Sequence, residues 1–249
     1  MKLAIDIGGT YLRSALIKKT KLYNFKKQKI ERNKKKLLLQ ITEAISSLNS
    51  WKINSIHISA PGPLEGGIIK NTPNIPLKNF DLKEYVEKIF HKKVFIENDA
   101  KCAALAELYF GCKKSNFIYI TIGTGIGGGI IINKKLYRGQ GFAGEWGHIN
   151  SEKNKDFEKI WQENRTDFNK ASIKQTKIIS YNIGKLIALL INIFDPEIVI
   201  IGGGIKKAGN KFLNEIKNIT YSSLFIPRRT PIKFSQFNEP SLIGASLLS

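Results

Sequence analysis

Cysteine is scarce in this sequence of 249 residues, which holds two of them, Cys102 and Cys112. Two cysteines form neither a disulfide framework nor a four-ligand metal site, and they suit a reducing compartment. Residues 1–10 have the pattern of a strand followed by a polar turn, not that of a signal peptide. No apolar run approaches the roughly 18 residues of a membrane span. These absences predict a cytoplasmic protein without a membrane-spanning segment.

Acidic residues are also few, with 20 Asp and Glu against 40 Lys and Arg, so the net charge is +20. Such an excess would suit a nucleic acid or another polyanion. The lysines, however, are spread along the whole chain together with abundant isoleucine and asparagine, which favours a bias in composition over a dedicated binding patch. We therefore expect no specific nucleic-acid partner. A positive field would still help to attract an anionic nucleotide or phosphosugar.

The pattern of apolar residues predicts an α/β protein. Strands are expected at 2–8, 11–18, 21–30, 55–60 and 93–97, and helices at 35–48, 81–90 and 99–110. In the helix 35–48, the residues expected on one apolar face are Leu38, Ile41, Ile45 and Leu48. His57 lies on an apolar strand and is interpreted as a core histidine. His91 is expected at the surface.

The order of elements then partly repeats. Strands are expected at 116–122, 126–132, 197–201 and 231–237, and helices at 176–193 and 208–218. Asn133-Lys134 is a hairpin signal between two of these strands. The stretch 150–170 is the least periodic and is predicted to be a surface loop. The repeat predicts two related lobes, 1–110 and 111–249.

In both predicted lobes an apolar strand runs into a glycine turn. Asp6-Ile-Gly-Gly-Thr10 allows backbone N–H groups to approach phosphate oxygens, and Asp6 stands where it could hold Mg²⁺ through water. A plain hairpin turn explains the same glycines equally well.

Two further glycine turns, 123–129 and 202–204, follow later strands. The first is not a Walker loop, because no Gly-Lys-Ser/Thr follows it. It is not a dinucleotide fingerprint either, because a strand rather than a helix comes next. The second turn could let an adenine or ribose lie on the backbone, although a tight strand-to-helix turn is the simpler interpretation. Together, the glycine turns at 6–10 and 123–129 suggest a phosphate chain held from both lobes.

Seven motifs, in order along almost the whole chain, resemble those of the ROK family of sugar kinases and repressors. They are DIGGT at 6–10, SAPGPL at 59–64, NTPNIP at 71–76, ENDAKCAALAE at 97–107, TIGTGIGGGI at 121–130, GQGFAGEWGHI at 139–149 and DPEIVIIGGGI at 195–205. The resemblance implies a two-lobed actin-like ATPase fold with the active site in the cleft between the lobes. It also implies ATP and Mg²⁺ as cofactors and a hexose as substrate.

The resemblance implies a role for each matching position. Asp99 would be the catalytic base, and Asp6 would hold Mg²⁺ through water. The implied sugar ligands are Asn74, Asn98, Asp99, Glu145 and His148. The implied phosphate and adenosine contacts are Gly8, Gly9, Thr10, Thr124, Gly125, Gly203 and Gly204. A helix N-cap is the structural alternative for Asp99.

The sequence departs from the family where most members place a cysteine-rich segment that binds zinc together with the histidine. Here the segment 149–161 reads INSEKNKDFEKIW and has no cysteine. A zinc site needs about four nitrogen or sulfur ligands, so we predict no zinc. Glu158 aligns with the glutamate that ends the family motif and is a candidate sugar ligand. Without zinc, His148 needs another partner to fix its tautomer. A carboxylate, backbone carbonyl or water from residues 150–158 is expected to supply it, and the nearby acids considered are Glu152 and Glu158.

The predicted function is ATP-dependent phosphorylation of a hexose on its 6-OH. Glucose is favoured by family frequency alone, N-acylmannosamine or N-acetylglucosamine is the alternative, and fructose remains open. Two rivals are a DNA-binding repressor and a non-catalytic sugar sensor. The position of Asp6 near the start argues against the first, and the full set of candidate residues argues against the second. A homodimer is compatible with the resemblance, although the stretch before Asp195 and the C-terminal helix are shorter than is usual.

Overall fold

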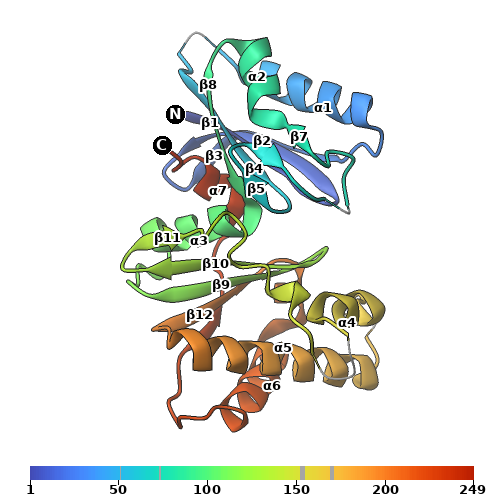
Figure 1. Cartoon of the computed structure of the whole chain (residues 1–249), viewed down its shortest axis with the longest axis vertical. Coiled ribbons are helices and arrows are strands. Elements are labelled where there is room, and N and C mark those ends of the chain that lie inside the picture. Colours follow the sequence, from blue (N-terminus) through green and yellow to red (C-terminus); the bar gives the residue numbers. More distant parts are fainter. Residues whose placement is uncertain (51, 73, 152–154, 169–170) are drawn as a thin grey trace. The chain divides into compact units, whose positions relative to one another are not determined.

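The computed structural model describes residues 1–50, 52–72, 74–151, 155–168 and 171–249. The chain forms two compact units. The first unit consists of Met1–Lys113, Arg138–Ala143 and Phe237–Ser249. The second unit consists of Lys114–Tyr137 and Gly144–Gln236. The predicted lobes were the continuous ranges 1–110 and 111–249. The observed division differs because Arg138–Ala143 and Phe237–Ser249 belong to the first unit. The last of them contains α7 (Pro240–Ala245), which packs against α3 (Asp99–Phe110) and β1 (Lys2–Ile7) (Figure 1).

The main sheet of the first unit has the strand order β3-β2-β1-β4-β8. Its other strands are β2 (Tyr11–Lys18), β3 (Lys21–Lys29), β4 (Ser55–Ala60) and β8 (Lys93–Asn98). Neighbours are antiparallel from β1 to β3, whereas β1, β4 and β8 run parallel. A second, small sheet consists of β5 (Leu64–Glu65), β6 (Ile68–Ile69) and β7 (Phe80–Asp81), paired in that order. The predicted strands of this half are confirmed.

The helices of the first unit are α1 (Lys34–Ser46), α2 (Leu82–Phe90), α3 and α7. Helices α1 and α2 contribute residues to the hydrophobic core cluster of this unit, and α3 packs against α7. In α1, Leu37 rather than Leu38 lies in the core with Ile41 and Ile45. The helix begins at Asn33, whose side chain accepts a hydrogen bond from the Lys36 N–H.

The second unit repeats the same sheet with the order β11-β10-β9-β12-β13. Its strands are β9 (Phe117–Ile122), β10 (Ile126–Ile132), β11 (Lys135–Tyr137), β12 (Ile198–Gly202) and β13 (Ile232–Phe234). As in the first unit, three strands are antiparallel neighbours and the other pairings are parallel. Asn133 and Lys134 both have positive φ, 51° and 60°, as a tight hairpin turn requires. The predicted repeat is therefore confirmed at the level of topology.

The helices of the second unit include one that the sequence pattern missed. They are η1 (Trp146–His148), α4 (Phe157–Asn164), α5 (Ile173–Phe194), η3 (Gly204–Ala208) and α6 (Gly209–Ser222). The prediction of a surface loop over 150–170 is wrong for α4. The Asp156 carboxylate caps this helix by accepting from the Lys159 N–H at 2.7 Å, and Phe157 and Trp161, one turn apart, are buried.

Helix α5 has 22 residues and is, by length and composition, apolar enough to cross a membrane. It contains the helix predicted at 176–193. Half of its most apolar window is buried, and residues such as Leu186, Ile187 and Leu190 lie in the core of the second unit. The core helix of a globular unit satisfies the same criteria, and the packing of α5 is of that kind.

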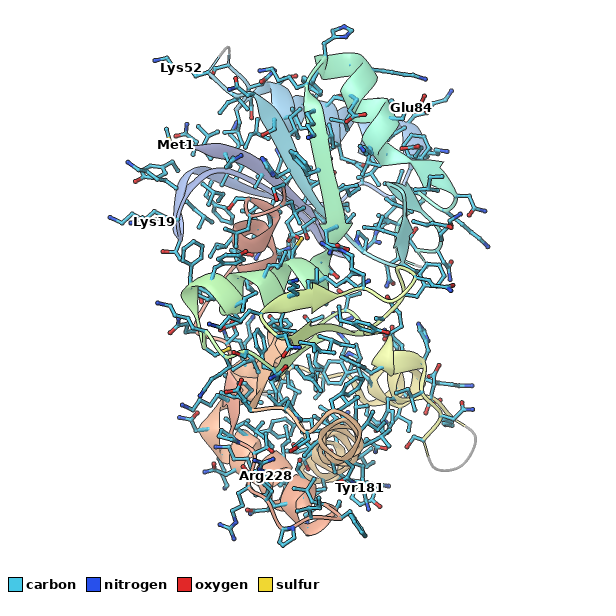
Figure 2. All side chains as sticks on the ribbon, turned by 60° about the vertical axis from the view of Figure 1, so that its left-hand side comes forward. Met1, Lys19, Lys52, Glu84, Tyr181 and Arg228 are labelled. Atoms are coloured by element: carbon cyan, nitrogen blue, oxygen red, sulfur yellow. The ribbon has the colours of Figure 1, made fainter. Side chains whose placement is uncertain are left out.

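The positive charges are dispersed in both units. Figure 2 shows Lys19 and Lys52 in the first unit and Arg228 in the second, all pointing outward, and all three are exposed. This distribution agrees with the spread that the sequence indicated.

Candidate active site

In the first unit, the predicted site residues gather at the carboxyl ends of the parallel strands. Asp6 near the end of β1 is opposite Ser59 of β4, and Ala60 is opposite Asn98 of β8. Because parallel strands end at one edge, three motifs far apart in sequence meet here. Ligands of open α/β sheets bind at such edges.

Asp6 is almost fully buried and has two side-chain partners. Its Oδ2 accepts from Arg13 Nη1 at 2.8 Å, and its Oδ1 accepts from the Ser59 hydroxyl at 2.7 Å. Burial raises the pKa of Asp6, while the Arg13 guanidinium and the Ser59 hydroxyl act in the opposite direction. Arg13 also contacts Glu239 at 2.9 Å through Nε. The Asp6 carboxylate is thus held rigidly, and part of its charge is already offset.

Asn98 and Asp99 mark the junction of β8 and α3. The N-cap is Asn98, whose Oδ1 accepts from the N–H groups of Ala100 and Lys101 at 3.0 and 3.2 Å. Asp99 is instead the first helical residue, so the N-cap alternative for Asp99 is not what the structure shows. A carboxylate in the first turn is stabilised by the helix dipole. Asn98 Nδ2 also donates to the Gly62 carbonyl at 3.1 Å, which joins this corner to the Pro-Gly-Pro turn.

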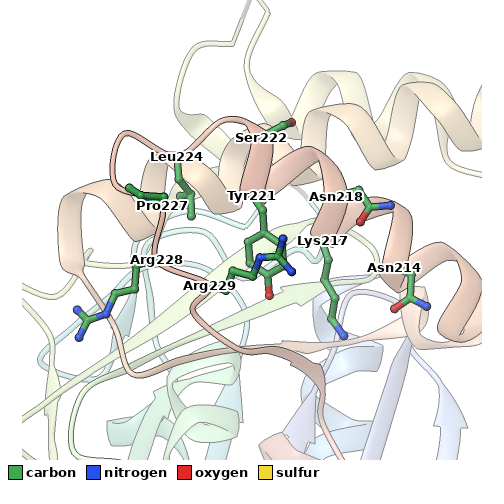
Figure 3. Close-up of a pocket in the computed structure, with 9 residues that line it drawn as sticks. All are labelled: Asn214, Lys217, Asn218, Tyr221, Ser222, Leu224, Pro227, Arg228 and Arg229. Atoms are coloured by element: carbon green, nitrogen blue, oxygen red, sulfur yellow. The ribbon is translucent and has the colours of Figure 1, made fainter.

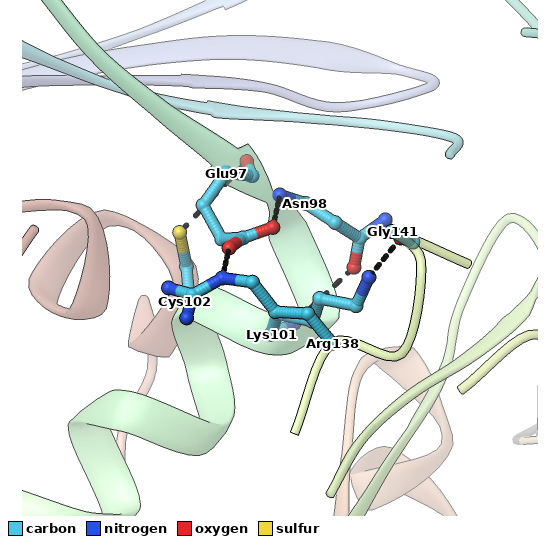
Figure 4. Close-up of polar contacts among 6 residues, drawn as sticks. All are labelled: Glu97, Asn98, Lys101, Cys102, Arg138 and Gly141. Atoms are coloured by element: carbon cyan, nitrogen blue, oxygen red, sulfur yellow. Dashed lines mark hydrogen bonds and ion pairs between the residues drawn. The ribbon is translucent and has the colours of Figure 1, made fainter. Parts of the chain in front are cut away.

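A polar network around Asn98 fixes the segment Arg138–Ala143 to the first unit (Figure 4). Arg138 Nε donates to the buried Glu97 carboxylate at 2.6 Å, and the other Glu97 oxygen accepts from the Asn98 N–H at 2.9 Å. The buried Lys101 ammonium donates to the Gly141 carbonyl. These contacts hold the first part of the 139–149 motif beside the junction of β8 and α3.

Asn74 lies in a loop that is anchored by its neighbours. Ile75 is buried, and its carbonyl accepts from the Thr72 hydroxyl at 2.8 Å. Arg32 donates to the carbonyl of Asn74. The side chain of Asn74 is half-buried, in the same unit as Asp99.

The glycine turn of the first unit is closed by its own backbone. The Gly8 N–H donates to the Tyr11 carbonyl at 2.9 Å. Gly8 therefore serves the turn, while Gly9 and Thr10 are half-buried residues of the same turn. The hairpin reading of these glycines is correct, and it does not exclude a phosphate contact.

The glycine turns of the second unit lie at the ends of the neighbouring strands β9 and β12. Gly123 N–H donates to the Gly125 carbonyl at 2.9 Å. Gly203 has a φ of 87° and lies so close to the Ile122 backbone that a Cβ would overlap it, so this turn requires glycine. Gly203 and Gly204 are exposed, and their backbone is open to a ligand.

Helix α4 supports the 123–126 turn with three side chains. Trp161 Nε1 donates to the Gly123 carbonyl at 3.1 Å, and Gln162 Nε2 donates to the Thr124 carbonyl at 2.6 Å. Glu158 Oε2 accepts from the Ile126 N–H at 2.7 Å. Glu158 is therefore both a predicted sugar ligand and a support of the turn predicted to bind phosphate.

Glu145 directly precedes the short helix η1, and His148 is its last residue. Between them Trp146 is buried against Gly128 of β10, where no Cβ would fit, and against the Phe194 ring at a centroid distance of 6.1 Å. Glu145 is half-buried and His148 exposed. His148 Nδ1 lies 3.4 Å from Asp156 Oδ2. A partner from 150–158 was predicted, but Asp156 was not among the acids considered, and Glu152 lies outside the described residues.

The predicted site residues fall into two groups, one in each unit. The first unit holds Asp6, Gly8, Gly9, Thr10, Asn74, Asn98 and Asp99; the second holds Thr124, Gly125, Glu145, His148, Glu158, Gly203 and Gly204. Sequence reasoning missed Arg13, Ser59, Asp156, Trp161 and Gln162. Two of these residues, Arg13 and Asp156, could have been found from the sequence. Arg13 lies opposite Asp6 in the β1–β2 hairpin, and Asp156 precedes an apolar pair at helical spacing.

A hollow of about 470 Å³ lies elsewhere in the second unit, at the end of α6 (Figure 3). It is lined by Asn214, Lys217, Asn218, Tyr221, Ser222, Leu224, Pro227, Arg228 and Arg229. Predicted site residues are absent from this lining, and Arg228 is already paired with Asp195 at 2.6 Å. We do not assign the active site to it.

The ROK family profile matches residues 2–159 and 150–249 of this chain. A glucokinase of Halalkalibacterium halodurans is 30% identical over 285 aligned positions, which cover 90% of this chain and 86% of the relative. A putative xylose repressor of Caldicellulosiruptor sp. is 30% identical over 250 positions, which cover 80% of this chain. The chain spans 63% of that repressor's length.

Solved structures of the family superpose on almost the whole chain. A ROK family glucokinase from Streptomyces griseus, in complex with glucose and AMPPNP, has a TM-score of 0.86 at 24% identity, with 99% of this chain and 98% of that one covered. A putative N-acetylmannosamine kinase from Listeria monocytogenes has a TM-score of 0.83 at 28% identity, with 99% and 97% covered. The two-lobed actin-like fold that the resemblance implied is thus confirmed. The chain belongs to the ROK family.

Proposed function

We propose that this chain is an ATP-dependent hexose kinase that acts in the cytoplasm and transfers the γ-phosphoryl group of ATP to the 6-OH of a hexose. The observation that carries the proposal is the placement of Asp99. It begins α3 directly after β8, at the sheet edge where Asp6 and the Gly8–Gly9 turn also lie. A carboxylate at this edge is suited to accept a proton from a hydroxyl. The relative named glucokinase supports the choice of glucose.

The residues present fit a nucleotide. Gly203 and Gly204 are exposed, so their backbone is open to an adenosine, and the 123–126 turn is held in shape by α4. For Mg²⁺, Asp6 fits a contact through water. Each Asp6 oxygen accepts one hydrogen bond, from Arg13 or Ser59, and retains a further lone pair for a water. When bound, Mg²⁺ would neutralise charge on the phosphates.

The chain's own residues would perform the remaining steps. Asp99 accepts the proton of the sugar 6-OH while the oxygen of that hydroxyl attacks the γ-phosphorus of ATP. The bond between the γ-phosphorus and the oxygen that bridges it to the β-phosphate breaks, and ADP leaves. Asn98 is fixed as the N-cap of α3, so its remaining amide hydrogen can orient a sugar hydroxyl. Glu145, His148 and Glu158 would bind the other hydroxyls, and Asn74 would bind the sugar from its loop. The backbone of Gly9, Thr10, Thr124 and Gly125 would bind phosphate oxygens.

A coupled assay for ADP release tests the proposal. Purified chain, ATP and Mg²⁺ are combined with glucose, fructose, N-acetylglucosamine or N-acetylmannosamine. We expect the highest kcat/KM with glucose, and phosphorus NMR should show a 6-phosphate. The highest kcat/KM with an amino sugar would select the alternative substrate class, to which the structural neighbour named as an N-acetylmannosamine kinase points. No sugar-dependent ADP release with any hexose would reject the proposal.

A non-catalytic, sugar-sensing regulator is the second candidate, and it is favoured by the xylose repressor that matches 80% of this chain. Calorimetry with xylose and glucose, without ATP, measures binding independently of catalysis. Under the kinase proposal, any DNA binding is weak, independent of sequence and steeply reduced by salt, because dispersed lysines contact only phosphates. Sequence-selective DNA binding at physiological salt that responds to xylose would favour the regulator.

A further inference from the structure

The loop that joins His148 to α4 is closed by backbone hydrogen bonds. The Phe157 N–H donates to the Ile149 carbonyl at 3.2 Å, and the Ser151 N–H donates to the Lys155 carbonyl at 2.7 Å. Asn150 and Asp156 form an antiparallel bridge. This register returns the chain at Asp156 to the neighbourhood of His148, so the approach of the two side chains is set by the backbone.

The two oxygens of Asp156 have separate partners. Oδ1 accepts from the Lys159 N–H at 2.7 Å and caps α4, which fixes the side-chain rotamer. Oδ2 is thereby directed to His148 Nδ1, at 3.4 Å. The neighbouring Lys155 ammonium contacts a different acid, Glu163, at 2.6 Å.

An ionised carboxylate accepts hydrogen bonds and donates none, so the imidazole nitrogen that faces it carries the proton. In a neutral ring protonated on Nδ1, the lone pair of Nε2 is free to accept a hydrogen bond. We propose that Asp156 is a positioning residue that holds His148 in this tautomer, so that Nε2 accepts a hydrogen bond from a sugar hydroxyl. The sugar contact rests on the proposed function; the tautomer does not.

The proposal extends to α4, because the carboxylate that orients His148 also begins the helix that carries Glu158. Glu158 is the second residue of α4 and binds the Ile126 N–H. A change that removes both functions of Asp156 would therefore disturb two predicted sugar ligands. The informative substitution is one that removes only the contact with His148.

Asp156→Asn is that substitution. Asn is as good an N-cap as Asp, so the carbonyl oxygen can keep the bond to the Lys159 N–H. The amide then turns its NH2 group to His148 and donates to Nδ1. The expected result is the opposite tautomer, with the proton on Nε2. The matched control is Asp81→Asn, since Asp81 caps α2 in the same way, at 2.8 Å from the Glu84 N–H, in the first unit.

The first measurement is nitrogen NMR of protein labelled with ¹⁵N-histidine. The chain has three histidines, and the signals lost in His148→Ala identify those of His148. We expect protonated Nδ1 in the wild type and in Asp81→Asn, and protonated Nε2 in Asp156→Asn. A wild-type ring protonated on Nε2, or a tautomer that Asp156→Asn leaves unchanged, would overturn the proposal whether or not the protein phosphorylates sugar.

The second measurement is steady-state kinetics with the hexose that the wild type phosphorylates fastest. A lost hydrogen bond weakens binding by about two- to tenfold. We expect the sugar KM of Asp156→Asn to rise by that factor, with the KM for ATP and the melting temperature close to the values of Asp81→Asn. A tautomer change without a change in sugar KM would overturn the role in sugar binding. A tautomer change in a protein that phosphorylates none of the sugars would support the role of Asp156 and reject the kinase proposal.

Discussion

Gln162 Nε2 lies 2.6 Å from the carbonyl oxygen of Thr124, and this hydrogen bond joins α4 to the turn after β9. Trp161 adds a second bond to the same turn, at Gly123. The same helix carries Glu158, a predicted sugar ligand. The element predicted to be a surface loop is thus the support of a turn predicted to bind phosphate.

Gln162→Ala should therefore weaken ATP binding more than sugar binding. The substitution removes the hydrogen bond to the Thr124 carbonyl and a longer one, 3.4 Å, to Glu158 Oε1. The side chain is exposed, so the fold should persist, while the Thr124 carbonyl gains freedom. We expect the KM for ATP to rise about two- to tenfold. Steady-state kinetics with ATP and hexose varied in turn would measure both constants.

The control for this variant is Gln40→Ala. Gln40 Nε2 also donates to a backbone carbonyl, that of Lys29, at 2.9 Å, but Gln40 lies in the first unit and in none of the predicted motifs. It should leave both KM values unchanged. Equal effects of the two substitutions, or an effect of Gln162→Ala on the sugar KM alone, would contradict the assigned role of α4.

Asp99→Asn tests the proposed base. Asn keeps the shape of the side chain and removes the proton acceptor, and Asn98 still caps α3. Loss of a general base typically lowers the rate by about 10²- to 10⁴-fold. We expect kcat to fall on that order while calorimetry shows sugar binding close to wild type. A variant that retains more than about half of the wild-type kcat would remove Asp99 from the mechanism.

The purified protein should contain no stoichiometric zinc, and its activity should require added Mg²⁺. The reason is chemical: the segment 149–161 offers no cysteine, and a structural zinc site takes about four nitrogen or sulfur ligands. Elemental analysis, together with activity measured in EDTA and after addition of Mg²⁺, tests both statements. Zinc bound at one per chain would show that ligands were missed in that segment.

Much of the fold could be predicted because strands and glycine turns leave local signals. The turn Asn133-Lys134 and the strands on either side of it were located from a few residues. The pairing of Asp6 with Arg13 was also within reach, because counting back from the Gly8–Gly9 turn places them opposite each other.

Other features depend on contacts that no local pattern encodes. Arg138–Ala143 belongs to the first unit because Arg138 meets Glu97 and Gly141 meets Lys101, across about 40 residues of chain. Helix α4 is short, so its apolar pair of Phe157 and Trp161 gives a weak periodic signal. The contacts of Trp161 and Gln162 with the 123–126 turn arise from packing between segments far apart in sequence, so no local pattern predicts them.

His57 gives a prediction about stability and pH. The residue is fully buried on β4, stacks on Phe95 at a centroid distance of 5.3 Å, and contacts the Ser55 hydroxyl at 2.9 Å through Nε2. The expectation of a core histidine is therefore confirmed. Burial, and secondarily the positive charge of Lys2, lowers the pKa of His57 from 6.5 to about 4.

A lowered pKa in the folded state means that the unfolded chain binds the extra proton first as the pH falls. The contribution of His57 to stability is thus fully present above pH 6.5 and is lost as the pH falls toward 4. Protonation of His57 should lower the free energy of unfolding by about 2 kcal/mol between about pH 7.5 and about pH 5.

His57→Asn removes the titrating group, so the stability of this variant should vary less over that range, although the variant is less stable overall. Urea unfolding at several pH values measures the slope, and His91→Asn, at an exposed position with left-handed backbone that asparagine tolerates, is the control. If His57→Asn and the wild type lose stability in parallel, the buried histidine is not the source of the pH dependence.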